Sequence, residues 1–202
     1  MKIVVARHGR PALELPGVIW SDDLRAVVER YDRTGIDPVL APPAALVRLA
    51  AEAGCVVCSP LQRARDSVQL VAPDHQLIVW ESLREAALPC PARRTLPLPL
   101  AAWVAIARIA WLLGWSPDAE SRAQAISRAS RAASELIGLA ERHGTVMVLG
   151  HDVFNRLLGV ALRRHGWVGR RPWINRYWGF QTYRPGGERL DSHFHPQPRV
   201  SP

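Results

Sequence analysis

Four short polar fragments of this chain carry the residues best suited to chemistry, and each follows, or nearly follows, a short apolar run. In chain order the fragments are Arg7-His8-Gly9, Ser59-Pro60-Leu61-Gln62-Arg63, Leu83-Arg84-Glu85 and Gly150-His151. Arginine offers a planar fork of donors that binds phosphate oxygens in pairs. A neutral imidazole can attack phosphorus, and a carboxylic acid can protonate a departing alkoxide. Together these side chains predict a site for phosphoryl chemistry.

Two of these residues have rivals close by in the sequence. Arg63 lies three residues into a helix expected to start at Pro60, where backbone N–H groups also favour anions. Arg65 is two residues further on and therefore faces another side of that helix. Glu81 lies close to Glu85 and is a second candidate for the proton donor, and a solvated surface glutamate is the ordinary alternative for either position.

For these fragments to meet, the apolar runs before them must be strands of one sheet. Compact runs of Val, Ile and Leu are typical of strands in sheets that are covered on both faces. We expect strands at residues 2–6, 55–59, 76–80, 145–150 and 179–184. Ligands bind at the carboxyl ends of the strands in open α/β sheets, so the fragments converge there if their strands are parallel neighbours.

Helical patterns separate the expected strands. The helices are expected from Ser21 to Arg33, from Pro42 to Gly54, from Pro60 to Val71, from Pro117 to His143 and from His151 to His165. Strands that alternate with helices indicate an α/β sandwich. A chain of 202 residues suits one domain, so we expect residues 1–202 to form a single domain.

One apolar segment stands apart from this alternation. Residues 96–115 contain three of the eight tryptophans and a single charge, Arg108. Two prolines at its start, the internal Arg108 and the flanking polar elements argue against a membrane span. We expect residues 86–115 to form a lid or insertion, with self-association into a homodimer as one option.

The last segment, residues 185–202, is rich in Pro and Gly and is expected to be an irregular tail. His193 and His195 in that tail have a spacing that could ligate a metal, but two histidines in a terminal segment are more often exposed and idle.

The net charge of +8 comes almost entirely from arginine, which supplies 25 of the 26 basic residues. The arginines are spread along the chain and form no dense block. This distribution argues against a nucleic-acid partner and suits a small anionic substrate.

The cysteines and the N-terminal residues indicate the compartment of the protein and whether it binds a metal. Cys55 and Cys58 have CxxC spacing, but they lie inside an expected strand and no second pair completes a zinc site, so we expect buried thiols. The apolar run before Arg7 is too short for the core of a signal peptide, which predicts a cytoplasmic protein. No glycine-rich nucleotide motif is present, and arginines can neutralise a phosphate, so no cofactor or metal is expected.

The order and spacing of the four fragments resemble the histidine phosphatase superfamily, also called the phosphoglycerate mutase-like family. The resemblance spans about three quarters of the chain. It implies a three-layer α/β/α fold with a mostly parallel central sheet, and a covalent phosphohistidine intermediate. It also implies that His8 is the nucleophile and that Glu85 is the proton donor. The phosphate pocket would then be formed by Arg7, Arg63 and His151.

The sequence departs from the family pattern after Gly9. Members that act on sugar phosphates often continue with Glu or Gln, then Thr or Ser, and soon an Asn. Here the residues are Arg10, Pro11 and Ala12, and Glu14 stands about where the Asn would fall. A carboxylate beside a bound phosphate would repel it, so Glu14 is expected to point elsewhere. Arg10 is expected to bind the phosphate or a second anionic group of the substrate.

The sequence therefore predicts a metal-independent phosphomonoester hydrolase that acts on a small anionic phosphate ester through a phosphohistidine. The alternatives are a phosphoprotein (phosphohistidine) phosphatase, a phosphoglycerate mutase-like phosphotransferase and a non-catalytic scaffold for phosphorylated ligands. A mutase must keep water from its phosphohistidine, and nothing in the sequence identifies a site for a bisphosphate primer. The complete set of basic residues argues against the scaffold.

Overall fold

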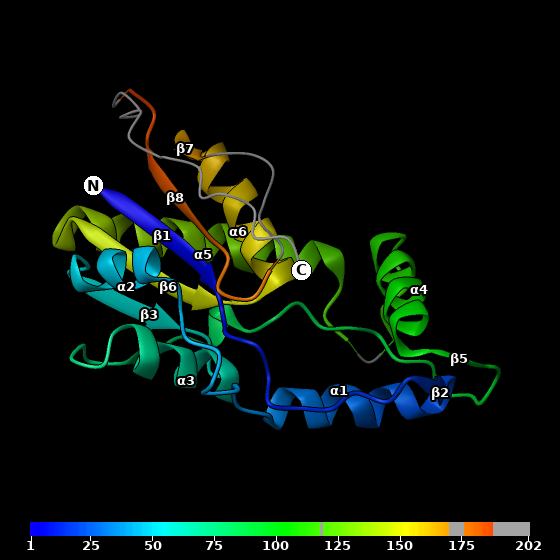
Figure 1. Cartoon of the computed structure of the whole chain (residues 1–202). Helices are drawn as coiled ribbons and strands as arrows, with labels where there is room; N and C mark the ends of the chain where they lie inside the picture. Colours follow the sequence, from blue (N-terminus) through cyan, green and yellow to red (C-terminus); the bar gives the residue numbers. More distant parts are fainter. Residues whose placement is uncertain (118, 170–175, 188–202) are drawn as a thin grey trace, which may run out of the picture.

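A six-stranded sheet forms the centre of the molecule (Figure 1). The computed structural model describes residues 1–117, 119–169 and 176–187. Across the sheet the strands are β4 (Ile78–Val79), β3 (Cys55–Cys58), β6 (Thr145–Gly150), β1 (Lys2–Arg7), β8 (Phe180–Pro185) and β7 (Trp167–Gly169). The central strands are apolar on both sides because both faces of the sheet are covered.

The directions of the strands decide where side chains can meet. β4, β3, β6 and β1 run parallel, whereas β8 is antiparallel to both β1 and β7. The register pairs Arg7 with Gly150, so β1 and β6 end at the same edge. The predicted α/β fold with a mostly parallel sheet is thereby confirmed.

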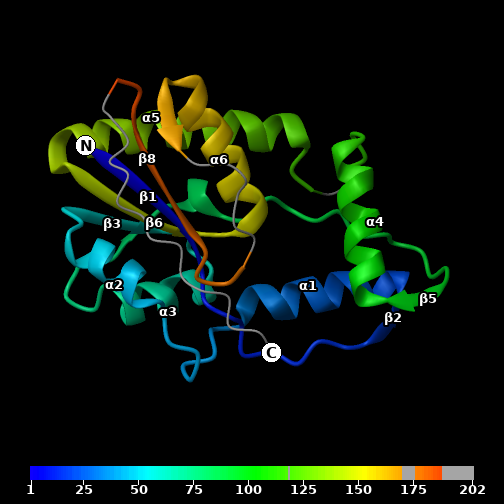
Figure 2. The same ribbon diagram turned by 45° about the horizontal axis from the view of Figure 1, so that its top comes forward.

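Helices cover both faces of the sheet and make the structure three-layered (Figure 2). One side carries α5 (Arg122–His143) and α6 (Asp152–Arg164), and the other carries α2 (Ala44–Ala51) and α3 (Gln62–Val71). Successive side chains of a strand point to opposite faces. Accordingly, Ile3 and Val5 pack with α5 and α6, while Val4 and Ala6 pack with α2 and α3.

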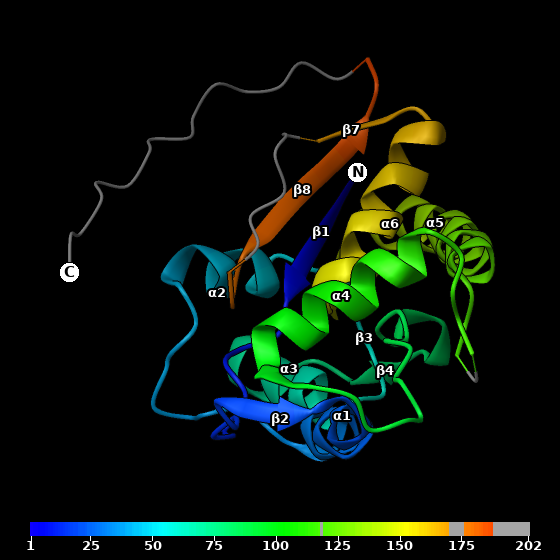
Figure 3. The ribbon, with the colours of Figure 1, turned by 90° about the vertical axis from the view of Figure 1, so that its right-hand side faces the viewer.

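A smaller unit, here called the cap, lies beyond the ends of β1 and β6 (Figures 1 and 3). It consists of α1 (Leu24–Arg33), α4 (Leu100–Leu112) and the antiparallel pair β2 (Val18–Trp20) and β5 (Pro97–Pro99). Buried apolar side chains hold it together, and the indole N–H of Trp103 donates to the carbonyl of Ile19 at 3.2 Å. Within the described ranges, no helix has the length and apolarity that crossing a membrane would require.

Several elements differ from the sequence-based expectation. β4 is only two residues long, and β2, β5 and β7 were not predicted, because three-residue strands are too short to show a period. α5 starts at Arg122 rather than at Pro117. The reason is a capping box, in which the Ser121 hydroxyl accepts the Gln124 N–H and the Gln124 side chain accepts the Ser121 N–H.

Cys55 and Cys58 are free and buried, as expected, and Cys90 is free and buried as well. Asp118 and residues 188–202, with His193 and His195, lie outside the described residues, so the expectations for them remain predictions.

Candidate active site

Four of the predicted site residues meet at the carboxyl edge of the sheet. β1 delivers Arg7 and, one residue on, His8, whose backbone N–H donates to the carbonyl of Gly150 at 3.0 Å. His151 follows β6 directly, and Arg63 lies in the first turn of α3 after β3. The parallel order of these strands is what brings together residues that are far apart in sequence.

His8 is held in one tautomer by its own neighbour. The ring is buried, with only 2% exposed, and its Nδ1 lies 2.7 Å from the carbonyl oxygen of Gly9. A carbonyl oxygen can only accept, so Nδ1 carries the proton and Nε2 has a free lone pair. That lone pair accepts the Nε–H of Arg63 at 3.2 Å.

Burial and nearby charges keep the two histidines neutral. Burial lowers the pKa of His8 well below its ordinary value of 6.5, and the positive charges of Arg63 and Arg7 lower it further, whereas the bond to Gly9 acts in the opposite direction. The pKa of His151 is lowered by burial first and then by Arg63, His8 and Arg7. The two rings are tilted neighbours, with centroids 5.1 Å apart.

Arg63 is almost completely buried and is anchored from α1. Its two terminal nitrogens both donate to Oδ1 of Asp32 at 3.1 Å, and one of them also donates to the carbonyl of Tyr31 at 3.0 Å. The guanidinium also lies 4.5 Å from the centroid of the Tyr31 ring. Arg7 has a matching neighbour, because its guanidinium lies 4.4 Å from the centroid of the Tyr177 ring.

His151 is buried beside Ser59. Its Nε2 lies 2.7 Å from the Ser59 hydroxyl oxygen, and that oxygen accepts the N–H of Leu61 at 3.3 Å. Among the described residues, its other ring nitrogen, Nδ1, is buried without a hydrogen-bond partner. A buried polar atom of this kind is available to a ligand.

Glu85 reaches the same region through the start of α6. One carboxylate oxygen accepts the N–H groups of Ala86 at 2.9 Å and Phe154 at 2.8 Å, and the other accepts that of Val153 at 3.3 Å. Val153 and Phe154 lie in the first turn of the helix that His151 precedes. Burial raises the pKa of Glu85 above its ordinary value of 4.5, although these backbone donors and Arg108 act in the opposite direction.

Glu81, the rival donor, lies in a different environment. Its side chain is exposed and pairs with Arg84 at 3.4 Å on the surface. Of the two glutamates, Glu85 is the one that contacts the helix start that follows His151.

Arg10 does not join the cluster around His8. It is exposed and lines a neighbouring pocket of about 710 Å³. The other residues that line this pocket are Pro11, Leu13, Glu14, Leu15, Tyr31 and Tyr177. Because the two tyrosines stack on Arg63 and Arg7, the pocket adjoins the predicted phosphate site. Glu14 lines this neighbouring pocket as well, and the expectation that it points away from the bound phosphate stays a prediction.

Several residues of the site were not predicted from the sequence. Ser67 accepts the N–H of Gly9 at 2.9 Å and donates to the carbonyl of Arg63 at 2.6 Å, so it joins two of the fragments. Ser59 and Ser67 lie within or next to the fragment that contains Arg63, which was the available signal. Asp32 and Tyr177 belong to no motif, and nothing local in the sequence marks them.

Solved structures share this fold at low sequence identity. A mycobacterial glucosyl-3-phosphoglycerate phosphatase in complex with VO3 is 23% identical, with a TM-score of 0.54 over 81% of this chain and 80% of that chain. A phosphoserine phosphatase from Entamoeba histolytica in complex with 3-phosphoglyceric acid is 18% identical, with a TM-score of 0.53 over 90% and 89%. A structure described as mycobacterial hydrolase 1 is 22% identical, with a TM-score of 0.54 over 81% and 80%. The search of curated proteins finds no match.

A family model matches the greater part of the chain. The matched residues are 34–176, which include Arg63, Glu85 and His151 and begin beyond the Arg7-His8 pair. The parallel strands bring that pair against the matched part, where His8 bonds to Arg63. The chain belongs to the histidine phosphatase superfamily, branch 1.

Proposed function

We propose that this protein is a phosphatase that hydrolyses small anionic phosphate monoesters through a phosphohistidine at His8. The observation that carries the proposal is the state of His8, a buried neutral imidazole with its proton held on Nδ1 by Gly9 and its Nε2 lone pair directed at Arg63. A neutral imidazole beside guanidinium groups is the arrangement that nucleophilic attack on a phosphate dianion needs.

The first step is transfer of the phosphoryl group to His8. The phosphate oxygens bind Arg7 and Arg63, and the Nε–H of Arg63 turns from His8 to an oxygen. The Nε2 lone pair then forms a bond to phosphorus, and the ester P–O bond breaks. The electron pair of that bond leaves with the ester oxygen, which takes the proton of Glu85.

The second step is hydrolysis of the phosphohistidine. Water attacks phosphorus and gives its proton to the carboxylate of Glu85, while the P–N bond breaks and its electron pair returns to Nε2. The N–H groups of Val153 and Phe154 stabilise the carboxylate between the two steps. Inorganic phosphate leaves, and His8 and Glu85 return to their starting protonation states.

His151 completes the phosphate pocket in this proposal. Its Nε2 is engaged by Ser59, and the buried Nδ1 has no partner among the described residues. We assign Nδ1–H as a donor to a phosphate oxygen, in the tautomer whose Nε2 accepts the Ser59 O–H. This role is a contact with the substrate and needs no net change in protonation.

The organic part of the substrate is assigned to the pocket beside the cluster. That pocket combines two tyrosine rings and apolar side chains with one cation, Arg10, and one anion, Glu14. A small phosphate ester with a polar organic group fits this mixture. The neighbours named for phosphoserine and glucosyl-3-phosphoglycerate phosphatase activity support a substrate of this size and class.

The decisive test is turnover of p-nitrophenyl phosphate by the whole chain in the presence of EDTA. We expect turnover to survive chelation and His8→Ala to lower kcat by about 1,000-fold or more, because the nucleophile is lost. His165→Ala is the matched control, since that histidine is exposed and its Nε2 lies 3.3 Å from the Ser134 hydroxyl, away from the site.

Two results would change the conclusion. Undiminished turnover by His8→Ala would exclude the phosphohistidine route. Binding of inorganic phosphate without turnover of any ester would instead identify a scaffold for phosphorylated ligands.

A further inference from the structure

The backbone on both sides of Glu85 is held by two arginines from different helices. Nη1 of Arg128, in α5, donates to the carbonyls of Ser82 at 2.7 Å and Arg84 at 2.8 Å. Arg108, in α4, donates to the carbonyls of Ala86 and Ala87, each at 3.2 Å. The segment that carries the proposed acid is thus fixed immediately before and immediately after Glu85.

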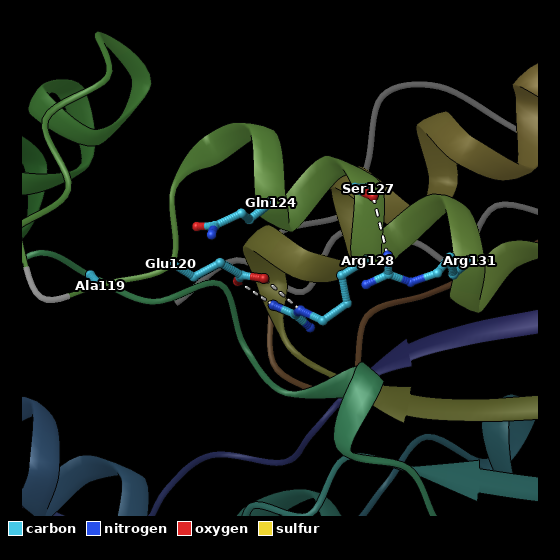
Figure 4. A pocket seen from close by; sticks show the side chains of 6 residues that line it. All are labelled: Ala119, Glu120, Gln124, Ser127, Arg128 and Arg131. Carbon is cyan, nitrogen blue, oxygen red and sulfur yellow. Dashed lines mark hydrogen bonds and ion pairs between the residues drawn. The ribbon is translucent and has the colours of Figure 1, made fainter.

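Arg128 is itself locked in position. Its Nε and Nη2 donate to the two carboxylate oxygens of Glu120 at 2.8 Å and 2.6 Å, a bidentate pair that Figure 4 shows in the pocket lined by both residues. Only 16% of the Arg128 side chain and 23% of the Glu120 side chain are exposed. A bidentate, mostly buried pair fixes geometry better than a surface ion pair does.

Arg128 also contacts Phe154, one of the residues whose backbone N–H holds the Glu85 carboxylate. Its guanidinium lies 4.1 Å from the centroid of the Phe154 ring. The N–H of Phe154 donates to Glu85 at 2.8 Å. One arginine therefore contacts both the loop that carries the acid and the helix start that holds its carboxylate.

Arg108 links this arrangement to the cap. It is the only charged residue of α4, and burial lowers its pKa, so its place in an otherwise apolar helix costs free energy. Its guanidinium lies 5.0 Å from the centroid of the Trp111 ring, and the Trp111 indole N–H donates to the carbonyl of Glu120 at 2.8 Å. The two arginines are thus joined through Trp111 and Glu120.

We propose that Arg108 and Arg128 are positioning residues that hold Glu85 in place for proton donation to the leaving group. The inference rests on the proposed function, in which Glu85 is the acid. A general acid acts only within hydrogen-bond reach of the leaving oxygen, so a small shift of residues 82–87 weakens it. The competing explanation is that both arginines only tie helices to a loop and stabilise the fold.

A series of aryl phosphates separates the two explanations. Esters with basic leaving groups, such as phenyl phosphate, need the acid, whereas p-nitrophenyl phosphate needs it little. We expect Glu85→Gln to lower kcat/KM for phenyl phosphate by about 100-fold and to steepen its dependence on leaving-group pKa. Arg128→Gln and Arg108→Gln are expected to steepen it too, with losses of about tenfold on phenyl phosphate and about twofold on p-nitrophenyl phosphate.

Arg131→Gln is the matched control, because Arg131 lines the same pocket and its side chain, within the described part of the chain, bonds only to Ser127 on its own helix (Figure 4). It is expected to leave the dependence unchanged. Arg128→Lys keeps the charge and disturbs packing less, but an ammonium lacks the fork that reaches both carbonyls and Glu120. The dependence of kcat/KM on leaving-group pKa in Arg128→Lys is therefore expected to lie between that of wild type and that of Arg128→Gln. In a Glu85→Gln background, Arg128→Gln is expected to add no further steepening.

Equal losses on all esters, with an unchanged slope, would overturn the inference and leave Arg108 and Arg128 as fold-stabilising residues. Hydrogen exchange of the amides of residues 82–87 gives a second readout that needs no turnover. We expect faster exchange in Arg128→Gln and Arg108→Gln but not in Arg131→Gln, and unchanged exchange would refute positioning. Failure of the proposed function appears elsewhere, as turnover that persists in His8→Ala.

Discussion

Burial acts on His8 and Glu85 in opposite chemical senses. Removing an ionisable group from water disfavours its charged form, so burial lowers the pKa of the His8 imidazole and raises the pKa of the Glu85 carboxyl group, favouring the neutral form of each. These are the two states that a nucleophile and an acid must have at the start of the proposed reaction. The same desolvation therefore prepares both groups, and the arginines around His8 add to its effect on the imidazole.

These shifts set the expected pH dependence. Because burial and the nearby arginines lower the pKa of His8 well below 6.5, His8 is the neutral nucleophile in weakly acidic as well as neutral solution. Glu85 must keep its proton, so activity on phenyl phosphate is expected to fall as pH rises through its raised pKa. Glu85→Gln is expected to be slower and to lack this decline.

The measurement is kcat/KM for phosphate release from phenyl phosphate across the acidic and neutral range. The ratio of wild type to Glu85→Gln cancels the ionisation of the substrate itself. A ratio that does not change with pH would remove Glu85 from the role of acid.

At the scale of elements, α1 contributes to the site although it lies outside the part of the chain that the family model matches. The family match begins at residue 34, just after α1 ends at Arg33. The last turn of α1 nevertheless supplies both Asp32 and Tyr31 to Arg63. A carboxylate on the guanidinium that is proposed to bind phosphate orients it but also opposes the approach of an anion.

Replacement of Asp32 by Asn is expected to tighten binding of inorganic phosphate by about fivefold. The amide oxygen of Asn still accepts from Arg63, so the guanidinium keeps its orientation while one negative charge disappears. The inhibition constant of phosphate against p-nitrophenyl phosphate turnover measures the change. Glu29→Gln on the same helix is the control, because Glu29 pairs with the exposed Arg33. Equal or weaker binding in Asp32→Asn would mean that orientation outweighs charge.

The elements also show what the sequence could predict and why the rest was hidden. Buried strands with apolar runs were recognisable, and their parallel order follows from the alternation with helices, so the meeting of Arg7, His8, Arg63 and His151 was foreseeable. The choice of Glu85 over Glu81 depends on the start of α6, a contact 68 or 69 positions along the chain. Asp32 and Tyr177 reach the site only through the packing of α1 and the return of the chain before β8, which no local pattern records.

At the scale of the whole molecule, the predicted phosphate pocket draws on segments from both ends of the chain. A ligand that binds only the folded protein stabilises it by mass action. We expect inorganic phosphate at 100 times its Kd to raise Tm by about 5 to 10 °C, which corresponds to about 2.7 kcal/mol for a chain of this size. In Arg63→Gln the shift should largely vanish at the same phosphate concentration.

Thermal unfolding of each protein with and without phosphate provides the comparison. Sodium chloride at equal ionic strength and Arg131→Gln serve as controls for salt and for loss of a positive charge. A phosphate-induced shift that survives in Arg63→Gln would place the anion elsewhere.

The order of the sheet has a consequence for the growing chain. β1 is synthesised first, yet its two neighbours are β6 and β8, which emerge after most of the chain has been made. Until then its backbone has no partner strand, and pairings over so long a loop form slowly. The segment that carries His8 therefore leaves the ribosome long before it can pair with its neighbours. A chain that ends early would expose the unpaired backbone N–H and C=O groups of β1, the strand that lies at the centre of the finished sheet, to other chains.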